Sequence, residues 1–374
     1  MRGTSPTQPT MLALVSMESL IPATHPLRRV KFLADEVLRE LDPIFDGMYA
    51  SVGRPSVAPE RLLKALVLMA LYGVRSERMF CEQLAYNMLF KWFLDMSMLD
   101  TPFDASAFSH NRQRLLEHAV ARQFFDAVVE RARRADLLSS EHFSVDGTLI
   151  EAWGSPKSFR PKEGDTQDNN SFVDFKGQQR RNETHESKTD PETRLYRKGF
   201  GREAKLSHMG HALIENRNGL VVDAEVTEAS GTAERDAALT MLQRERKRRD
   251  KKARKGRNDQ RKKNRKGRRL TVAADKAYDT KDFVRRCRQL RITPHVAKFE
   301  HARRRSAIDG RTTVHAGYAM STTARLLVEK PFGWLKTYGG LRRSRFRGRS
   351  RTESAVLISF TALNLLRIAN LTAA

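Results

Sequence analysis

The chain has 374 residues, of which 40% are hydrophobic, so it is long enough for one large or two ordinary domains with real cores. Its 69 Lys and Arg outnumber its 44 Asp and Glu by 25, and this positive charge favours binding to a polyanion such as DNA or RNA. Two cysteines are too few for a disulfide scaffold or a zinc site and suit a reducing cytoplasm.

No part of the sequence predicts a membrane partner. The N-terminus lacks the basic and then apolar pattern of a secretion signal. The most apolar stretches are Leu62 to Leu71, which is too short to cross a bilayer, and Val356 to Leu371, which contains Arg367 and two asparagines. Both are predicted to be packed helices.

The first part of the chain is predicted to be helical. Residues 1–25 are expected to be a flexible arm, and residues 26–138 an all-α N-terminal domain, because apolar residues recur there at helical spacing. Its last segment starts near Asp104 or Ser106 and carries Arg112 and Arg114. That polar helix suits either the reading of DNA ends or a connection between domains, and both interpretations stay open.

The pattern changes in residues 139–374. A short strand at 142–146 is followed by a polar loop at 151–204, and two strands flank Asn218-Gly219, a pair typical of a type I′ hairpin. The remaining elements are a helix from Ala233, a strand at 270–274, a helix at 280–290, a strand at 292–296 and a helix at 322–338. This order predicts an α/β domain with a mixed sheet flanked by helices, and it is the order of the ribonuclease-H-like fold.

Two segments concentrate the positive charge. Residues 244–269 contain 17 Lys or Arg and three acids, which is consistent with a solvated helix extension, with an arm on DNA phosphates, or with both. A second cluster, which includes Arg342, Arg343 and Arg345, follows Gly339-Gly340 and suits a groove around a nucleic-acid backbone.

Three acids are candidates for phosphodiester chemistry, which in a basic protein without Cys or His ligands usually relies on Mg²⁺. Asp146 ends the first strand, although Asp146-Gly147 is also a common turn dipeptide. Asp275 follows an apolar strand, and the nearby Asp279 is predicted to be the helix N-cap. Glu329 lies at helical spacing from Arg325 and Lys336, which an ordinary ion pair on a solvated face would also explain, whereas Trp334 falls on the opposite face.

Four histidines, His142, His208, His211 and His295, show no spacing typical of a zinc or di-iron site. His208 and His211 are predicted to lie in a strand on a charged surface.

These residues carry a resemblance. The spacing Arg325–Glu329–Lys336 resembles the Arg-x3-Glu-x6-Lys signature of insertion-sequence DDE transposases, although Thr322 stands where that signature has Tyr. Longer phrases resemble the insertion-sequence 5 family of bacterial transposases, within the insertion-sequence 4/5 superfamily. They are Gly53 to Ser56, Tyr72 to Glu77, His142 to Trp153, Glu215 to Leu220, Ala274 to Asp279 and Glu329 to Lys336.

The resemblance implies a ribonuclease-H-like enzyme that cuts DNA at transposon ends and transfers the strands into target DNA. It assigns the acidic triad and metal ligands to Asp146, Asp275 and Glu329, with two Mg²⁺ ions per site as the cofactor and Mn²⁺ as a substitute. It implies double-stranded DNA as partner, at terminal inverted repeats and target, and a homodimer in the bacterial cytoplasm, associated with the nucleoid. The DNA contacts that we expect are Arg325, Lys336, Trp334, Arg342, Arg343, Arg345, Arg112 and Arg114.

The expected strand order makes a testable statement about where the three acids lie. Asp146 and Asp275 meet only if their strands are parallel neighbours, with Glu329 facing them and Lys336 on the same rim. Two other functions stay open: a ribonuclease-H-like nuclease without strand transfer, and a DNA-binding protein without catalysis.

Overall fold

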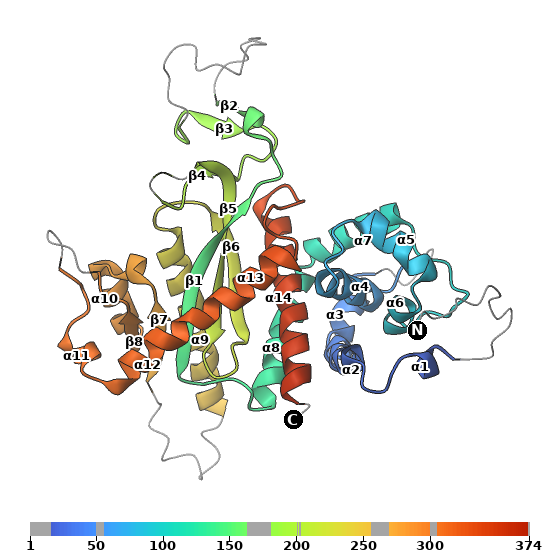
Figure 1. Ribbon diagram of the computed structural model, residues 1–374, viewed down its shortest axis with the longest axis horizontal. Coiled ribbons are helices and arrows are strands. Elements are labelled where there is room, and N and C mark those ends of the chain that lie inside the picture. Colours follow the sequence, from blue (N-terminus) through green and yellow to red (C-terminus); the bar gives the residue numbers. More distant parts are fainter. Residues whose placement is uncertain are drawn as a thin grey trace, which may run out of the picture.

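A computed structural model describes residues 16–49, 56–162, 181–199, 201, 203–255, 269–299 and 305–372, without the side chains of residues 252–255. Its centre is a mixed sheet (Figure 1). The strands are β1 (His142–Glu151), β4 (Arg194–Tyr196), β5 (Lys205–Glu215), β6 (Val221–Glu228), β7 (Leu270–Ala274) and β8 (Ile292–Val296).

The strand order confirms the predicted fold. β5 pairs antiparallel with β1 on one side, and with both β6 and β4 along its other edge. β7 pairs parallel with β1, and β8 pairs parallel with β7. Three antiparallel strands followed by two parallel ones, with β1 in the middle, are the ribonuclease-H-like arrangement that the order of elements predicted.

Helices cover both faces of the sheet. Figure 1 shows α13 crossing in front of β1 and α9 running behind the sheet. The helices of this part are α9 (Ala233–Lys255), α10 (Lys281–Gln289), α11 (Gly310–Thr313), α12 (Ala316–Ala324), α13 (Glu329–Thr337) and α14 (Arg349–Leu371), with 3-10 turns η1 (Pro156–Ser158), η4 (Lys276–Tyr278) and η5 (Arg325–Val328).

The N-terminal part is helical throughout the residues described. Its helices are α1 (Met17–Leu20), α2 (Pro26–Arg39), α3 (Asp42–Asp46), α4 (Pro59–Leu71), α5 (Glu77–Tyr86), α6 (Met88–Phe93), α7 (Ala105–Glu117) and α8 (Val120–Arg134). The last helical segment is broken at His118 and Ala119, where Ala119 has a φ of 51°.

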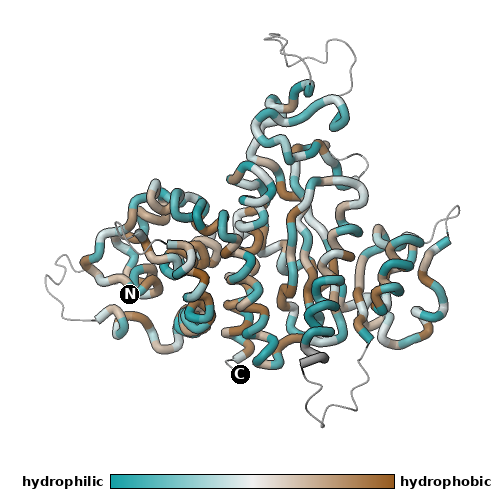
Figure 2. The backbone as a smooth tube through the Cα atoms, turned by 180° about the vertical axis from the view of Figure 1, so that it is seen from behind, coloured by the Kyte–Doolittle hydropathy of each residue, from teal (hydrophilic) through white to brown (hydrophobic). Residues whose placement is uncertain are grey.

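The C-terminal helix α14 joins the two parts of the molecule. It packs against α2, α4, α8 and β6, and Figure 2 shows hydrophobic positions along it and along the central strands. α14 is long and apolar enough to cross a membrane, but 67% of its most apolar window is buried inside the protein. It is the core helix that its sequence predicted.

Four local predictions were wrong. β1 does not end at Asp146, because β5 pairs with β1 through Glu151 and holds it extended. The described parts of the polar loop at 151–204 include a two-stranded sheet of β2 (Phe159–Pro161) and β3 (His185–Ser187), as well as β4. Thr280, rather than Asp279, caps α10 by accepting a hydrogen bond from the Phe283 N–H.

The fourth concerns the hairpin between β5 and β6. Gly219 has a φ of +68°, but Asn218 has no positive φ, so the turn is not type I′. The carboxylate of the buried Glu215 instead organises this turn by accepting hydrogen bonds from the N–H groups of Ser139, Arg217, Asn218 and Leu220.

Candidate active site

Strand pairing brings two of the predicted acids together. β1 pairs with β7 so that Ser144 lies opposite Ala273. Continuing this parallel register by two residues puts Asp146 opposite Asp275, the first residue after β7. Asp275 accepts a hydrogen bond of 2.9 Å from the Ala277 N–H and so begins η4. The two carboxylates therefore lie at the point where β7 stops and β1 continues, paired with β5 but no longer with β7.

The electrostatic surroundings of Asp146 agree with that position. Burial raises the pKa of its carboxyl, and the negative charge of Asp275 raises it further. Lys198, the Gly147 N–H at 2.7 Å and Arg325 act in the opposite direction. A half-buried carboxylate with an acid beside it and two cations nearby is an unusual arrangement for a purely structural aspartate.

Glu329 stands apart from this pair. It is the first residue of α13, is exposed, and forms no hydrogen bond or ion pair with any side chain that the structure describes. In the described part of the chain, no three Asp, Glu, His or Cys side chains converge closely enough to share a metal ion. The structure thus brings Asp146 and Asp275 together but leaves Glu329 separate.

The cations on either side of Glu329 do reach the pair. Arg325, the first residue of η5, lies near enough to Asp146 to lower its pKa, and the Arg325 Nε is buried without a hydrogen-bond partner. Burial lowers the pKa of Lys336, and Lys198 and Arg342 lower it further, whereas Asp146 raises it. Arg325 and Lys336 therefore both lie within electrostatic reach of Asp146.

The other expected DNA contacts have different surroundings. Trp334 is partly buried against the core and stacks on Tyr338, with ring centroids 6.2 Å apart. Arg343 donates from Nε and Nη2 to the carbonyls of Ala152 and Trp153, each at 3.1 Å, which fixes the end of β1. Arg342 is exposed and stays available to a phosphate.

Arg112 and Arg345 lie together where α7 meets the segment that follows α13. Their guanidinium groups lie over the Phe346 ring, at 4.8 Å and 5.3 Å from its centroid, and Arg112 also pairs with Glu77. Burial and neighbouring arginines lower the pKa of each to about 10. Arg114 lies over the Tyr49 ring instead, at 4.9 Å.

The described part of the basic run at 244–269 is tied to the protein. Arg244 binds Asp223 at 2.7 Å and Glu225 at 2.7 Å, and Arg248 binds Asp126 at 2.8 Å. Arg244 thus ties α9 to β6 and Arg248 ties it to α8, so neither is free for DNA. Residues 256–268 of this run lie outside the described residues.

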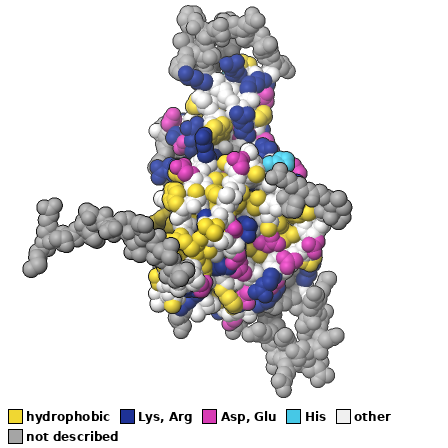
Figure 3. All heavy atoms as spheres, turned by 90° about the vertical axis from the view of Figure 1, so that its right-hand side faces the viewer, with side chains coloured by type: hydrophobic (Ala, Val, Ile, Leu, Met, Phe, Trp, Pro, Cys, Tyr) yellow, Lys and Arg dark blue, Asp and Glu magenta, His cyan; other side chains and the backbone are white. Residues whose placement is uncertain are grey.

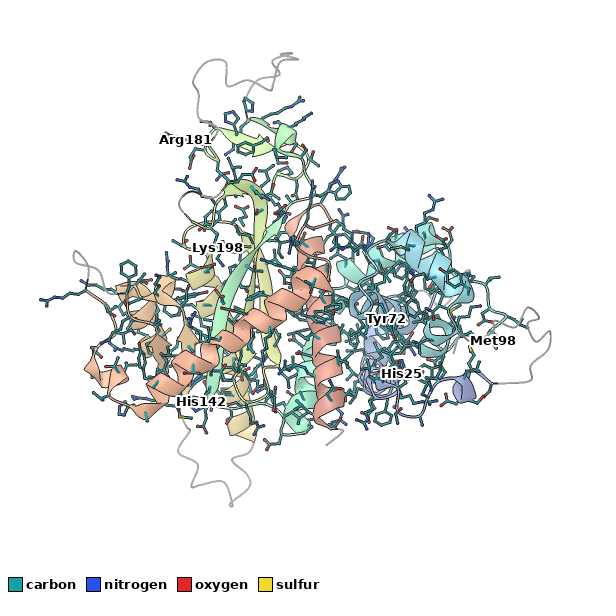
Figure 4. The ribbon with its side chains drawn as sticks, in the orientation of Figure 1. His25, Tyr72, Met98, His142, Arg181 and Lys198 are labelled. Atoms are coloured by element: carbon teal, nitrogen blue, oxygen red, sulfur yellow. The ribbon has the colours of Figure 1, made fainter. Side chains whose placement is uncertain are left out.

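Sequence reasoning missed three polar residues beside the two aspartates. Lys198, labelled beside β1 in Figure 4, donates a hydrogen bond of 2.8 Å to the Gly147 carbonyl. Glu234 in the first turn of α9 and the buried Tyr278 of η4 both interact electrostatically with Asp146 and Asp275. Of these three residues, only Tyr278 could have been found from the sequence, since it lies in the segment Ala274 to Asp279, which resembles the transposase family.

The two histidines of β5 were also placed wrongly. His208 and His211 are fully buried, because β5 is an interior strand of the sheet. His208 contacts Asp190 at 3.2 Å, and burial lowers the pKa of His211 to about 3.

Comparison with known families decides what this site belongs to. Residues 15–114 match the family described as Transposase domain (DUF772), and residues 138–365 match the Transposase DDE domain, which is more than half of the chain. The chain belongs to the DDE transposase family. It is therefore an enzyme that cleaves DNA strands and transfers them, and its family implies dependence on a divalent metal ion.

Similarity to individual proteins is remote. No functionally curated protein matches the transposase in sequence. A piggyBac transposase synaptic complex with hairpin DNA is 9% identical over 93% of this chain and 76% of that chain, with a TM-score of 0.38. A pre-cleavage Mos1 transpososome is 13% identical over 87% of this chain and 81% of that chain, with a TM-score of 0.21. A Mos1 mariner paired-end complex with Mn is 13% identical over 90% of this chain and 83% of that chain, with a TM-score of 0.19. No residue role follows from likenesses this low.

The residues of the transposase fit a divalent ion in their chemistry. Asp146 and Asp275 offer the hard oxygen donors that such ions prefer, and their repulsion would be relieved by a cation between them. The Tyr278 hydroxyl, fully buried beside them without a hydrogen-bond partner, is a further oxygen at this position.

Proposed function

We propose that this transposase moves an insertion sequence of the insertion-sequence 5 type, by cleaving DNA at the terminal inverted repeats and joining the ends to target DNA. The observation that carries the proposal is the placement of the segment Arg325–Glu329–Lys336. Its first turn packs against β1, and its two cations lie within electrostatic reach of Asp146. The two cations of a transposase signature thus lie near an aspartate of the sheet, which supports the proposal.

In this proposal Asp146, Asp275 and Glu329 are the catalytic acids and would hold two Mg²⁺, or Mn²⁺ in their place. Two such ions would activate the attacking oxygen and stabilise the leaving one. The unpartnered Arg325 Nε and the Lys336 ammonium would hold the phosphate that is cut, since both cations face the acid pair. Glu329 would reach the pair by a shift of α13, which is favourable once a cation offsets carboxylate repulsion.

The division of labour between the parts follows from charge. Residues 26–138 are proposed to bind the transposon ends and residues 139–374 to cut and join. The arm expected at residues 1–25 is wrong for its second half, because residues 17–20 form α1, and residues 1–15 lie outside the described residues. The exposed Arg342 would contact the DNA backbone directly. The other expected DNA contacts would shape that surface, because each side chain is held by a carbonyl or an aromatic ring of the same chain. They are Arg343, Arg345, Arg112, Arg114 and Trp334.

A homodimer is part of the proposal. The outer end of the helical part exposes Tyr86, Met88, Met98 and Leu99, the last of them 93% exposed. Figure 3 shows hydrophobic side chains gathered on this side of the molecule. An apolar patch of this kind supports contact between two copies at paired ends. The proposed place of action is the bacterial cytoplasm, on the nucleoid.

The acid assignment is tested by removing one ligand charge at a time. Asp146→Asn, Asp275→Asn and Glu329→Gln should each lower strand cleavage in Mg²⁺ roughly a thousandfold or more, because each loses several kcal/mol of metal-centred stabilisation. DNA binding should persist, since it depends on the basic surface. Cleavage of a labelled end-containing duplex and its retention on a gel measure the two properties separately.

Asp282→Asn is the matched control, because Asp282 is an exposed acid of α10 whose ion-pair partners in the described part of the chain are Arg285 and Arg286 alone. It should cleave like the wild type. Wild-type cleavage by any one triad variant would remove that residue from the assignment. Sequencing of the products separates the alternatives, because a transposase yields joined DNA and a nuclease yields only cut DNA.

A further inference from the structure

Glu234 approaches the catalytic strand more closely than an ordinary helix residue would. A β-carbon built on Gly147 would lie 2.8 Å from the Glu234 Cγ and 3.0 Å from its Oε1. The carboxylate of Glu234 therefore lies directly over the backbone next to Asp146. Its side chain is only 20% exposed. A larger residue in place of Gly147 would prevent this approach.

The charges around Glu234 connect it to both aspartates. Burial raises the pKa of the Glu234 carboxyl, and Asp146 and Asp275 raise it further, whereas Lys198 lowers it. The Lys198 ammonium lies 3.7 Å from the Glu234 Oε1 while it donates to the Gly147 carbonyl. A single lysine thus serves two carboxylates, Asp146 and Glu234, and it is itself half exposed.

Two buried polar atoms without partners lie at the same place. The Tyr278 hydroxyl is fully buried and interacts most strongly, among charged groups, with Glu234 and then with Asp146 and Asp275. The His211 Nδ1 is buried, lacks a hydrogen-bond partner, and would lie 3.0 Å from a β-carbon on Gly147. Buried donors and acceptors are rarely left unsatisfied, so these atoms point to a ligand or its water shell.

We propose that Glu234 is a fourth carboxylate of the catalytic centre, which binds the divalent cation together with Asp146 and Asp275. Since no three acidic side chains of the described residues converge on one metal position, Glu234 would act through a water molecule or after the cation draws the carboxylates together. It approaches from α9, behind the sheet in Figure 1, whereas Glu329 approaches from α13 in front. The inference rests on the proposed acid centre. It adds a residue that neither the signature spacing nor the strand ends identified.

A structural role for Glu234 makes a different prediction. An acid in the first turn of a helix stabilises that helix, and Glu234 and Asp236 both occupy the first turn of α9. If that were its whole function, Glu234→Gln and Asp236→Asn would have similar effects. Asp236 is the matched control because it is exposed on the same turn and, among the residues that the structure describes, its carboxylate pairs only with Arg286, at 3.4 Å.

The experiment measures Mn²⁺ binding to the full-length protein without DNA, by the electron paramagnetic resonance signal of free Mn²⁺. Glu234→Gln should weaken binding about 10- to 100-fold, which is the usual effect of losing a carboxylate from the surroundings of a bound metal. Asp236→Asn should bind like the wild type. Glu234→Asp, which keeps the charge on a shorter side chain, should fall between the two.

Thermal unfolding without metal shows that the variants are folded. Glu234→Gln should keep the wild-type Tm or exceed it, because it removes a half-buried charge that faces two like charges. If Glu234→Gln does not fold, the Mn²⁺ affinity of Glu234→Asp is measured instead. A wild-type Mn²⁺ affinity of Glu234→Asp, together with the failure of Glu234→Gln to fold, would assign Glu234 a structural role. Wild-type affinity in Glu234→Gln would overturn the inference outright.

Asp146→Asn separates this inference from the function on which it rests. If it weakens Mn²⁺ binding and Glu234→Gln does not, the acid centre stands and Glu234 is not part of it. If neither variant weakens binding, both proposals fail. Weaker binding in Glu234→Gln alone would show that Glu234 binds a cation at a place separate from Asp146, which also overturns the shared centre.

Discussion

At the scale of single residues, Gly147 shows how a local pattern and a tertiary contact differ. In the sequence, Asp146-Gly147 is compatible with a strand end or a turn. In the structure both residues lie inside β1, where Gly147 pairs with His211 of β5. The glycine leaves space for Glu234, which comes from a helix distant in sequence. No local pattern contains that information, so the sequence could predict Asp146 but not its neighbour Glu234.

Replacement of Gly147 should therefore lower the stability of the fold. Gly147→Ala forces a β-carbon against Glu234 and His211, and we expect it to lower the free energy of unfolding by about 1–3 kcal/mol, the usual cost of overpacking. Urea unfolding measures this change. Gly231→Ala is the control, because no heavy atom lies within 4 Å of a β-carbon built there, so its stability should stay close to that of the wild type. Equal stabilities of the two variants would contradict the close approach.

At the scale of elements, predictions succeeded where the determining signals were local. The strands at 270–274 and 292–296 are short apolar runs that match β7 and β8 in both bounds. The end of β1 could not be predicted, because pairing with β5 rather than its own sequence keeps it extended. The helix expected at 322–338 is divided among α12, η5 and α13. Pro331 falls in the first turn of α13, where its missing N–H removes no helical hydrogen bond.

The hairpin between β5 and β6 gives a prediction at this scale. The Glu215 carboxylate accepts four backbone N–H groups and is fully buried, so Glu215→Ala should leave those donors unsatisfied. We expect a loss of at least about 3 kcal/mol in the free energy of unfolding, since each unsatisfied buried donor costs about 1–3 kcal/mol. Glu228→Ala, at the far end of β6, loses one surface ion pair with Arg194 and should cost about 1 kcal/mol or less. Thermal unfolding compares the two variants, and similar losses would disprove the role of Glu215.

At the scale of the whole molecule, a single hydrophobic core continues from the N-terminal helices into the sheet. The sequence predicts a change from a helical to an α/β pattern near residue 138, and β1 begins shortly after it, at His142. The sequence could not show that the last helix returns to the first ones. α14 supplies this link, because its two apolar sides serve α2, α4 and α8 as well as β6. Strand order likewise predicted the meeting of Asp146 and Asp275, whereas the contacts of Lys198 and Glu234 depend on this tertiary packing.

A fragment of residues 26–138 should therefore not fold by itself. Without α14, the buried faces of α2, α4 and α8 become exposed to water, and most helical stability comes from such packing. Circular dichroism should show reduced helicity and no cooperative melting for this fragment, and one transition for the full chain. Joining residues 349–372 to the fragment through a flexible linker should restore cooperative melting, because α14 is then available to cover those faces. Cooperative melting of the fragment alone would instead show that the helical part is an independent domain, and that α14 merely rests on its surface.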